Sequence, residues 1–322
     1  MRFTRSTSLD ILLWHVHGSW TTSFVQGRHR YLLPTLPDSS AWGRGRGGRD
    51  WPDSAREVAA ADLAATEVDL VVLQRPEELE LAQRWLARAV PGEVPAVYVE
   101  HHAPHEHAAT TVHHLAARHD IPVVHVTHFN ELMWDSGYAP TVVIPHGIVD
   151  PGHLYSGELP RAGALINEAN RRRRVTGTDL LEGFASVAPV DVFGIDAENI
   201  DIPGVTGVGD LRTPELHQQL AQRRAYVHTA RWTSLGLSLL EAMQLGMPVV
   251  APATTEAIAA VAPGTGVIST DIAVLQRALR DFADDPDLAA DRGKNAREHA
   301  LTNFGLPAFL DTWDTLCGEL TR

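Results

Sequence analysis

The chain has 322 residues, 44% of them hydrophobic and 21% charged, which suits two globular domains of about 150 residues each. A formal net charge of -13 argues against binding chiefly to nucleic acid or to an anionic membrane, and the single cysteine, Cys317, excludes an intramolecular disulfide. With no signal sequence and no apolar run near the roughly 20 residues of a membrane helix, we expect a cytoplasmic protein with no stable membrane insertion and no nucleic-acid partner.

Short aliphatic runs alternate with amphipathic segments along the whole chain. Strands are predicted at residues 9–14, 68–73, 96–100, 123–126, 141–144, 162–166, 190–193, 225–229, 249–251 and 266–268. Helices are predicted between them, including residues 76–89, 178–186, 214–223, 237–245 and 272–282. Continuously apolar strands that alternate with helices are typical of parallel sheets covered on both faces. The predicted fold class is therefore α/β.

Two segments interrupt this alternation. Residues 42–49, WGRGRGGR, are expected to form a mobile loop. Residues 144–152, IPHGIVDPG, contain several helix and strand breakers and lie near the middle of the chain. We place the domain boundary there, which gives one domain over residues 1–145 and a second over 146–307.

Polar residues follow the predicted strands of the first domain, at the strand ends where ligands of open α/β sheets bind. Gly18 and Ser19 follow the first strand, and His101 and His102 follow a later one. These residues are candidates for contacts with a ligand, although an ordinary surface role is the commoner one for any single histidine. The chain has 17 histidines but no His-Glu-x-x-His pattern, so no metal site is expected.

A basic segment follows the first strand of the second domain. Four consecutive arginines occupy positions 171–174. The planar guanidinium group suits bidentate contact with phosphate, and Arg172 and Arg174 are the candidates for it. The alternative is a solvated basic loop.

The segment 233–252, TSLGLSLLEAMQLGMPVVAP, predicts a helix that starts after a glycine. The free backbone amides of a helix start attract anions, and Gly236 lacks the Cβ that would obstruct a diphosphate. Glu241 lies more than one turn further on, where a carboxylate can accept hydrogen bonds from both ribose hydroxyls. The alternative is that Glu241 merely caps or pairs at a partly exposed helix face.

These motifs together resemble glycosyltransferase family 4, the group 1 enzymes of the GT-B fold. The resemblance is carried by residues 236–251, by Pro145-His-Gly-Ile148, by Glu256 and by residues 284–297. It implies two Rossmann-like domains whose parallel sheets face each other across a cleft. The first domain would bind the acceptor and the second the nucleotide-sugar, and helix 308–322 would cross back onto the first domain.

The resemblance also implies roles for single residues. Ser234, Gly236, Leu237 and Glu241 would bind the nucleotide, with Arg172 and Arg174 at its phosphates. Gly18 and Ser19 would bring backbone near the donor or acceptor, and His101 or His102 would lie at the reacting sugar. Thr233 stands where the family carries the first Glu of its E-x7-E motif, and Thr176 stands where it carries a Lys. A threonine hydroxyl can contact a sugar but cannot supply charge.

The expected activity is transfer of a sugar from a UDP- or GDP-sugar to a small-molecule or glycan acceptor, with retention and without a cofactor or metal. The first alternative is a catalytically silent nucleotide-sugar-binding protein or partner subunit, which the two threonines favour. A metal-dependent hydrolase that uses the histidines is the second. The sequence leaves the acceptor and the oligomeric state open.

Overall fold

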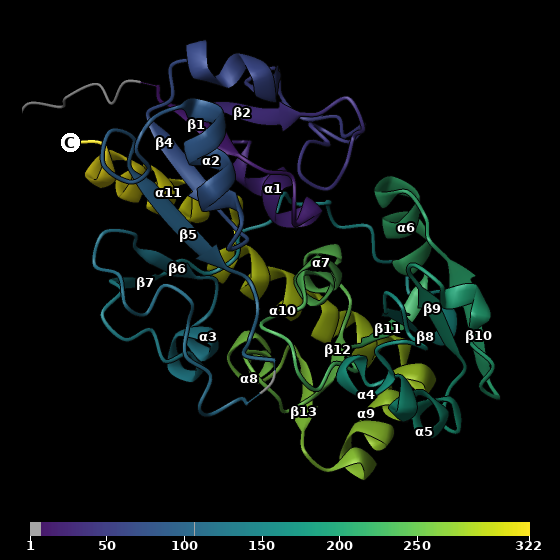
Figure 1. Ribbon diagram of the computed structural model, residues 1–322. Helices are drawn as coiled ribbons and strands as arrows, with labels where there is room; N and C mark the ends of the chain where they lie inside the picture. The colour runs from purple at the N-terminus through teal and green to yellow at the C-terminus, as the bar shows by residue number, and fades with distance from the viewer. Residues whose placement is uncertain (1–7, 106) are drawn as a thin grey trace, which may run out of the picture. The chain divides into compact units, whose positions relative to one another are not determined.

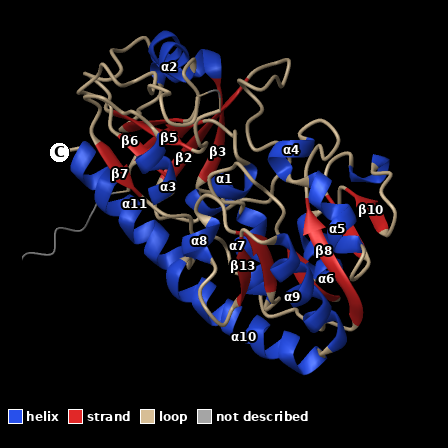
Figure 2. Ribbon diagram, turned by 90° about the horizontal axis from the view of Figure 1, so that it is seen from below, coloured by secondary structure: helices blue, strands red, loops and turns tan. Residues whose placement is uncertain are grey.

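The computed structural model describes residues 8–105 and 107–322. The chain divides into two compact units, one formed by Met1–Val149 with Leu306–Arg322 and the other by Asp150–Gly305. Each unit contains a parallel sheet with helices packed around it (Figures 1 and 2). The fold class predicted from the sequence is therefore confirmed.

The sheet of the first unit has seven strands in the order β3-β2-β1-β4-β5-β6-β7. Every neighbouring pair is parallel. The strands are β1 (Asp10–Leu13), β2 (Arg30–Thr35), β3 (Ala55–Ala59), β4 (Leu70–Leu73), β5 (Ala96–Glu100), β6 (Val123–His125) and β7 (Thr141–Val143). The chain reverses its direction of travel across the sheet after β3, so β1 and β4 are neighbours from the two halves.

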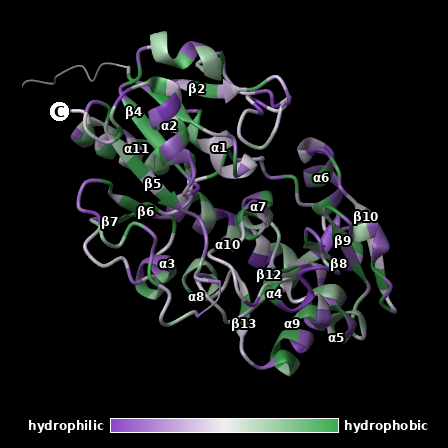
Figure 3. Ribbon diagram, viewed as in Figure 1, coloured by the Kyte–Doolittle hydropathy of each residue, from purple (hydrophilic) through white to green (hydrophobic). Residues whose placement is uncertain are grey.

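Helices cover both faces of this sheet, which explains its apolar strands. All four residues of β4, LVVL, are at most 1% exposed, and β4 and β5 are mostly hydrophobic (Figure 3). The helices are α1 (Gly18–Phe24), η1 (Ala60–Ala65), α2 (Glu78–Leu86), α3 (His128–Met133) and α11 (Leu306–Leu320).

Helix α11 is last in the chain but belongs to the core of the first unit. The Trp313 ring centroid lies 5.8 Å from that of Trp20 and 5.0 Å from that of Phe24. Asp314 pairs with Arg28 at 2.9 Å, and its other carboxylate oxygen lies 3.1 Å from Nε2 of His29. Trp313 is only 2% exposed, so the helix closes the apolar face that α1 leaves open.

The sheet of the second unit has six parallel strands in the order β10-β9-β8-β11-β12-β13. The strands are β8 (Leu159–Leu165), β9 (Val190–Phe193), β10 (Val205–Gly209), β11 (Arg223–Val227), β12 (Val249–Pro252) and β13 (Gly266–Ser269). Numbered along the unit, this order is 3-2-1-4-5-6, that of the dinucleotide-binding fold. Its switch point lies between β8 and β11.

Seven α-helices and two short 3-10 helices of the second unit surround this sheet. They are α4 (Arg173–Thr176), η2 (Thr178–Leu180), α5 (Leu181–Ala185), η3 (Ala197–Asn199), α6 (Thr213–Leu220), α7 (Leu237–Leu245), α8 (Ala257–Ala260), α9 (Ile272–Asp284) and α10 (Pro286–Asn303). Helix α10 packs closely on the end of α7, because a Cβ on Gly293 would lie 2.0 Å from the Gly246 carbonyl oxygen. Glycine is therefore required at this crossing.

Three strands were not predicted from the sequence. Strand β2 contains Pro34, which usually argues against a central strand, and β10 contains two glycines. Strand β3 lies at the sheet edge and exposes most of its residues. The segment 42–49, expected to be a loop, consists mostly of turns and forms one isolated bridge between Thr35 and Arg44.

The packing of α11 predicts a large effect for Trp313→Ala. Loss of this buried indole should lower the free energy of unfolding by about 3–5 kcal/mol. Urea denaturation followed by circular dichroism measures the change. Glu319→Ala, on an exposed position of the same helix, is the matched control and should be nearly neutral. Equal effects of the two changes would mean that α11 does not pack as described.

Candidate functional site

A pocket of ≈ 190 Å³ lies in the second unit at the carboxyl ends of β8 and β11. Parallel strands end at the same edge of a sheet, so the loops after β8 and β11 meet at the switch point. The start of α7 and the loop around α4 complete the wall. The lining residues are Leu165, Ile166, Asn167, Arg172, Val175, Thr176, His228, Thr229, Ala230, Trp232, Thr233, Gly236 and Ser238.

The amino end of α7 borders this pocket without a side-chain cap. Its N-cap is Gly236, and the first turn contains no acidic residue. The first backbone amides of the helix therefore remain available to an anion.

The ring of His228, the first residue after β11, leaves no room for a side chain at position 236. A Cβ on Gly236 would lie 2.6 Å from Cε1 of the His228 ring. The imidazole is 6% exposed, and burial lowers the pKa of His228 from 6.5 to about 4. A neutral histidine thus lies against the glycine that begins α7.

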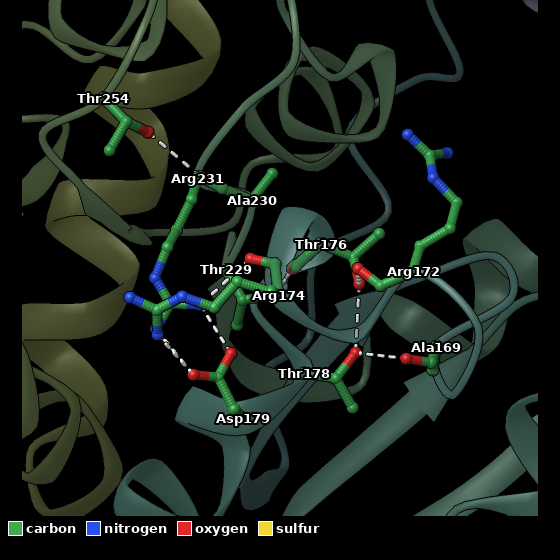
Figure 4. Close-up of polar contacts among 10 residues, drawn as sticks. All are labelled: Ala169, Arg172, Arg174, Thr176, Thr178, Asp179, Thr229, Ala230, Arg231 and Thr254. Carbon is green, nitrogen blue, oxygen red and sulfur yellow. Dashed lines mark hydrogen bonds and ion pairs between the residues drawn. The ribbon is translucent and has the colours of Figure 1, made fainter. Parts of the chain in front are cut away.

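The two candidate arginines point to different surroundings (Figure 4). Arg172 lines the pocket, whereas Arg174 does not. The Arg174 guanidinium pairs with Asp179 at 2.9 Å and its side chain is 78% exposed. Asp179 also accepts two hydrogen bonds from Arg231, one of them at 3.0 Å. Of the two arginines, only Arg172 is placed to meet a ligand in the pocket.

Threonines fasten the loop around α4 to the end of β11. The Thr229 hydroxyl donates to the Thr176 carbonyl at 2.6 Å, and the Thr178 hydroxyl donates to the Ala169 carbonyl at 2.9 Å. Gly177 has φ +73°, and a Cβ there would lie 1.9 Å from the Thr229 carbonyl oxygen. The wall of the pocket that carries Thr176 is therefore held by Thr229, two residues after the end of β11.

The other residues predicted in the second unit lie at different depths. Thr233 lines the pocket, while Ser234, Leu237 and Glu241 are not part of its lining. Ser234 is 3% exposed. One carboxylate oxygen of Glu241 lies 3.5 Å from Nε2 of His217 on α6. His228 and Asn167 line the pocket but were not predicted; their only sequence signal is a polar residue directly after a buried strand.

In the first unit, histidines gather at the carboxyl edge of the sheet. The His17 ring centroid lies 4.0 Å from that of His101 and 5.0 Å from that of His102. Burial, together with His102, His146 and Arg75, lowers the pKa of His17 to about 3. Burial also lowers the pKa of His101 well below 6.5, with His17, His146 and His102 adding to the effect. His17 and His101 are therefore neutral at pH 7.

Gln74, directly after β4, fixes the tautomer of His101. Its amide nitrogen donates to the Trp14 carbonyl at 2.8 Å, so its Oε1 is the atom that accepts from His101 Nε2 at 3.1 Å. The buried Glu78 carboxylate accepts from the backbone N–H of Gln74 at 2.6 Å. Burial raises the pKa of Glu78 to about 7, although Arg75 opposes this effect. Because the proton of the neutral His101 ring is on Nε2, its Nδ1 keeps a lone pair.

Gly18 and Ser19 begin α1 in the same unit. A Cβ on Gly18 would lie 2.9 Å from a guanidinium nitrogen of Arg49 and 3.6 Å from His15 Nε2. Ser19 is exposed, and its carbonyl accepts from Ser23 at 3.3 Å. Gly18 therefore lies beside one positive charge, that of Arg49, because burial together with Arg44 and Arg49 lowers the pKa of His15 to about 4.

Residues 8–105 and 107–322 contain no group of three or more His, Cys, Asp or Glu side chains arranged to hold a metal ion. No helix in this part of the chain has the length and hydrophobicity needed to cross a membrane.

Solved structures identify the architecture. Anabaena Alr3699/HepE in complex with UDP superposes with a TM-score of 0.73 at 16% identity, over 97% of this chain and 100% of that chain. Sucrose-phosphate synthase from Thermosynechococcus elongatus gives a TM-score of 0.69 at 15% identity, over 97% and 99%. The fold is GT-B. At these identities the GT-B likeness concerns the fold alone.

Sequence comparisons find similarity to glycosyltransferases over part of the chain. Residues 202–299 match the family model described as glycosyl transferases group 1. D-inositol 3-phosphate glycosyltransferase of Streptomyces avermitilis is 38% identical over 119 residues, which is 35% of this chain. The match spans only 24% of that protein's length. The matched family segment contains His228, Thr233 and Gly236 of the pocket.

The hydrogen bond from His101 to Gln74 predicts an imidazole that carries its proton on Nε2 and is neutral at pH 7. Nitrogen-15 NMR of the histidine rings should show this tautomer in the folded protein. The urea-unfolded chain is the control, in which histidines titrate near pH 6.5. Gln74→Met removes the acceptor and should release the tautomer preference. An Nε2 without a proton in the wild type would contradict the assignment.

Proposed function

We propose that this protein is a glycosyltransferase whose second unit binds a nucleoside-diphosphate sugar. The observation that carries the proposal is the pocket at the switch point, which combines an uncapped helix start with Arg172 inside a GT-B fold. UDP is the first nucleotide to test, because HepE structures contain UDP and UDP-glucose. GDP is the alternative.

In this proposal each side chain has one task. The amides of α7 and Arg172 hold the diphosphate, and Ser234 and Leu237 belong to the same turn. Glu241, on the second turn of α7, accepts hydrogen bonds from the ribose hydroxyls. Thr233 contacts the donor sugar from the pocket wall.

The first unit supplies the acceptor side of the proposed reaction. His101 and His102 contact the reacting sugar, and Gly18 and Ser19 bring backbone near the donor or acceptor. The acceptor is a small molecule or a glycan, the reaction retains the anomeric configuration as in family 4, and no metal is required. We place this activity in the cytoplasm.

A second candidate is a nucleotide-sugar-binding protein without transferase activity. The specific observation is that Thr233 and Thr176 line the pocket with uncharged hydroxyls. The resemblance to family 4 implies a Glu and a Lys at these two positions. Such a protein binds the donor but does not turn it over.

A two-stage experiment separates these functions. Thermal-shift measurements with UDP, GDP, ADP and dTDP find the cognate nucleotide, because a ligand of the native state raises its apparent stability. Donor hydrolysis or transfer is then measured with the corresponding sugars, with and without EDTA. Turnover that survives EDTA supports the transferase. Tight binding without turnover supports the silent binder, and failure to bind all four nucleotides rejects both.

The different environments of Arg172 and Arg174 make a matched pair of variants. Arg172→Ala should weaken UDP binding about 10-fold or more while uridine binding is unchanged, because a charge-assisted hydrogen bond is worth about 1.5–3 kcal/mol. Arg174→Ala, whose guanidinium pairs with Asp179, should leave UDP affinity within about 2-fold. Calorimetry measures both ligands. Equal losses for UDP and uridine in Arg172→Ala would indicate a folding defect instead.

The proposed roles of Glu241 and Thr233 predict different kinetic effects. Glu241→Ala should raise the donor KM by about one to two decades, because ribose contacts exist in ground and transition states alike. Thr233→Val should lower kcat or change donor choice while UDP affinity hardly changes. Steady-state kinetics and UDP titrations measure these effects. Wild-type UDP affinity in Glu241→Ala would show that the ribose is bound elsewhere.

A further inference from the structure

The charge inside the pocket is small for a diphosphate site. Arg172 is the one permanently charged side chain among the lining residues, and the other polar members are neutral amides, hydroxyls and rings. Thr176 and Thr233 contribute hydroxyls only. A bound nucleoside diphosphate brings at least two negative charges, so a second cation would strengthen binding considerably.

His228 is the lining residue that can become that cation. It follows β11 directly, is 6% exposed, and lies against Gly236 at the start of α7. The absence of a Cβ at Gly236 lets the ring approach the helix start, where a Cβ would meet Cε1 at 2.6 Å. An anion held by the first amides of α7 therefore binds next to the imidazole.

Few charges act on this ring in the free protein. Burial is the one cause of its lowered pKa, about 4. Arg172 reaches the same pocket from the segment before α4 and is the charged side chain of its lining. On α7, the Ser238 hydroxyl accepts a hydrogen bond from the Tyr226 hydroxyl at 2.9 Å, and the Glu241 carboxylate lies 3.5 Å from Nε2 of His217. The Tyr226 ring centroid lies 6.4 Å from that of His228.

We propose that His228 is a proton-linked ligand of the diphosphate: it is neutral in the free protein and takes up one proton from solvent when the nucleotide binds. The resulting imidazolium replaces the positive charge that Thr176 does not carry. This inference rests on the proposed donor site and adds a specific residue and a proton to it.

The magnitude is sufficient for a switch near neutral pH. One negative charge at about 4 Å raises the proton affinity of the ring about 1,000-fold at the effective dielectric constant typical of proteins. Since the pKa of His228 in the free protein is about 4, the bound ring then titrates in the neutral range. Affinity for the nucleotide consequently falls as pH rises through this range, because the bound ring loses its proton.

The test compares UDP binding by the wild type, His228→Gln and His153→Gln between pH 6 and pH 8. UDP itself ionises in this range, and the comparison between variants cancels that contribution. Wild-type affinity should fall about 10-fold more than that of His228→Gln as pH rises from 6 to 8. Calorimetry in buffers of different ionisation enthalpy should show uptake of up to one additional proton. His153 is exposed and outside the lining, so His153→Gln should behave as the wild type.

A second measurement uses the wild type alone, in case His228→Gln folds poorly. Nitrogen-15 NMR at pH 7 should show a neutral His228 ring without UDP and a substantial imidazolium population with saturating UDP. If the wild type binds UDP but the ring stays neutral, the inference is wrong and the donor site stands. If His228→Gln keeps the wild-type pH dependence, the inference is likewise wrong. A wild type that binds no nucleoside diphosphate overturns the donor site and the inference together.

Discussion

The parallel arrangement of all strands is the constraint on which both candidate sites depend. Because every strand of a unit runs in the same direction, the polar loop residues after the strands collect at one edge. The strand order changes direction between β8 and β11, so the loops after these two strands lead to opposite sides of the sheet. The pocket forms between them. The histidines after β1 and β5 meet in the first unit for the same reason. Neither cluster requires residues that are close in sequence.

Fold class and most strands follow from the sequence because they reflect local patterns. An apolar run such as LVVL in β4 indicates a strand buried on both faces, and its burial bears this out. Strands β2 and β10 deviate from that pattern, since one contains a proline and the other two glycines. Their pairing depends on the neighbouring strands rather than on local preference. Element boundaries also differ from the predicted ones. The helix predicted over residues 76–89 spans Glu78–Leu86, and Ala87 after it is left-handed with φ +51°.

The composition of the pocket was predictable only in part. Thr233 and Gly236 belong to a continuous motif, so a sequence pattern could find them. The choice between Arg172 and Arg174 could not be made, because it depends on the pairing of Asp179 with Arg231, which is 52 residues away in the chain. His228 was not predicted as a site residue. Its contact with Gly236 and its burial are set by the tertiary structure, and the residue at a single sequence position does not indicate them.

The position of α11 has a consequence for how the chain is synthesised. The first unit is discontinuous: its opening 149 residues are separated from Leu306–Leu320 by the whole second unit. During translation Trp20 and Phe24 are synthesised before the second unit, whereas their partner Trp313 is synthesised after it. The nascent first unit therefore exposes an aromatic surface while the second unit, which is continuous, can complete its own core. We therefore expect chaperones to bind the nascent chain at this aromatic surface until α11 has been synthesised.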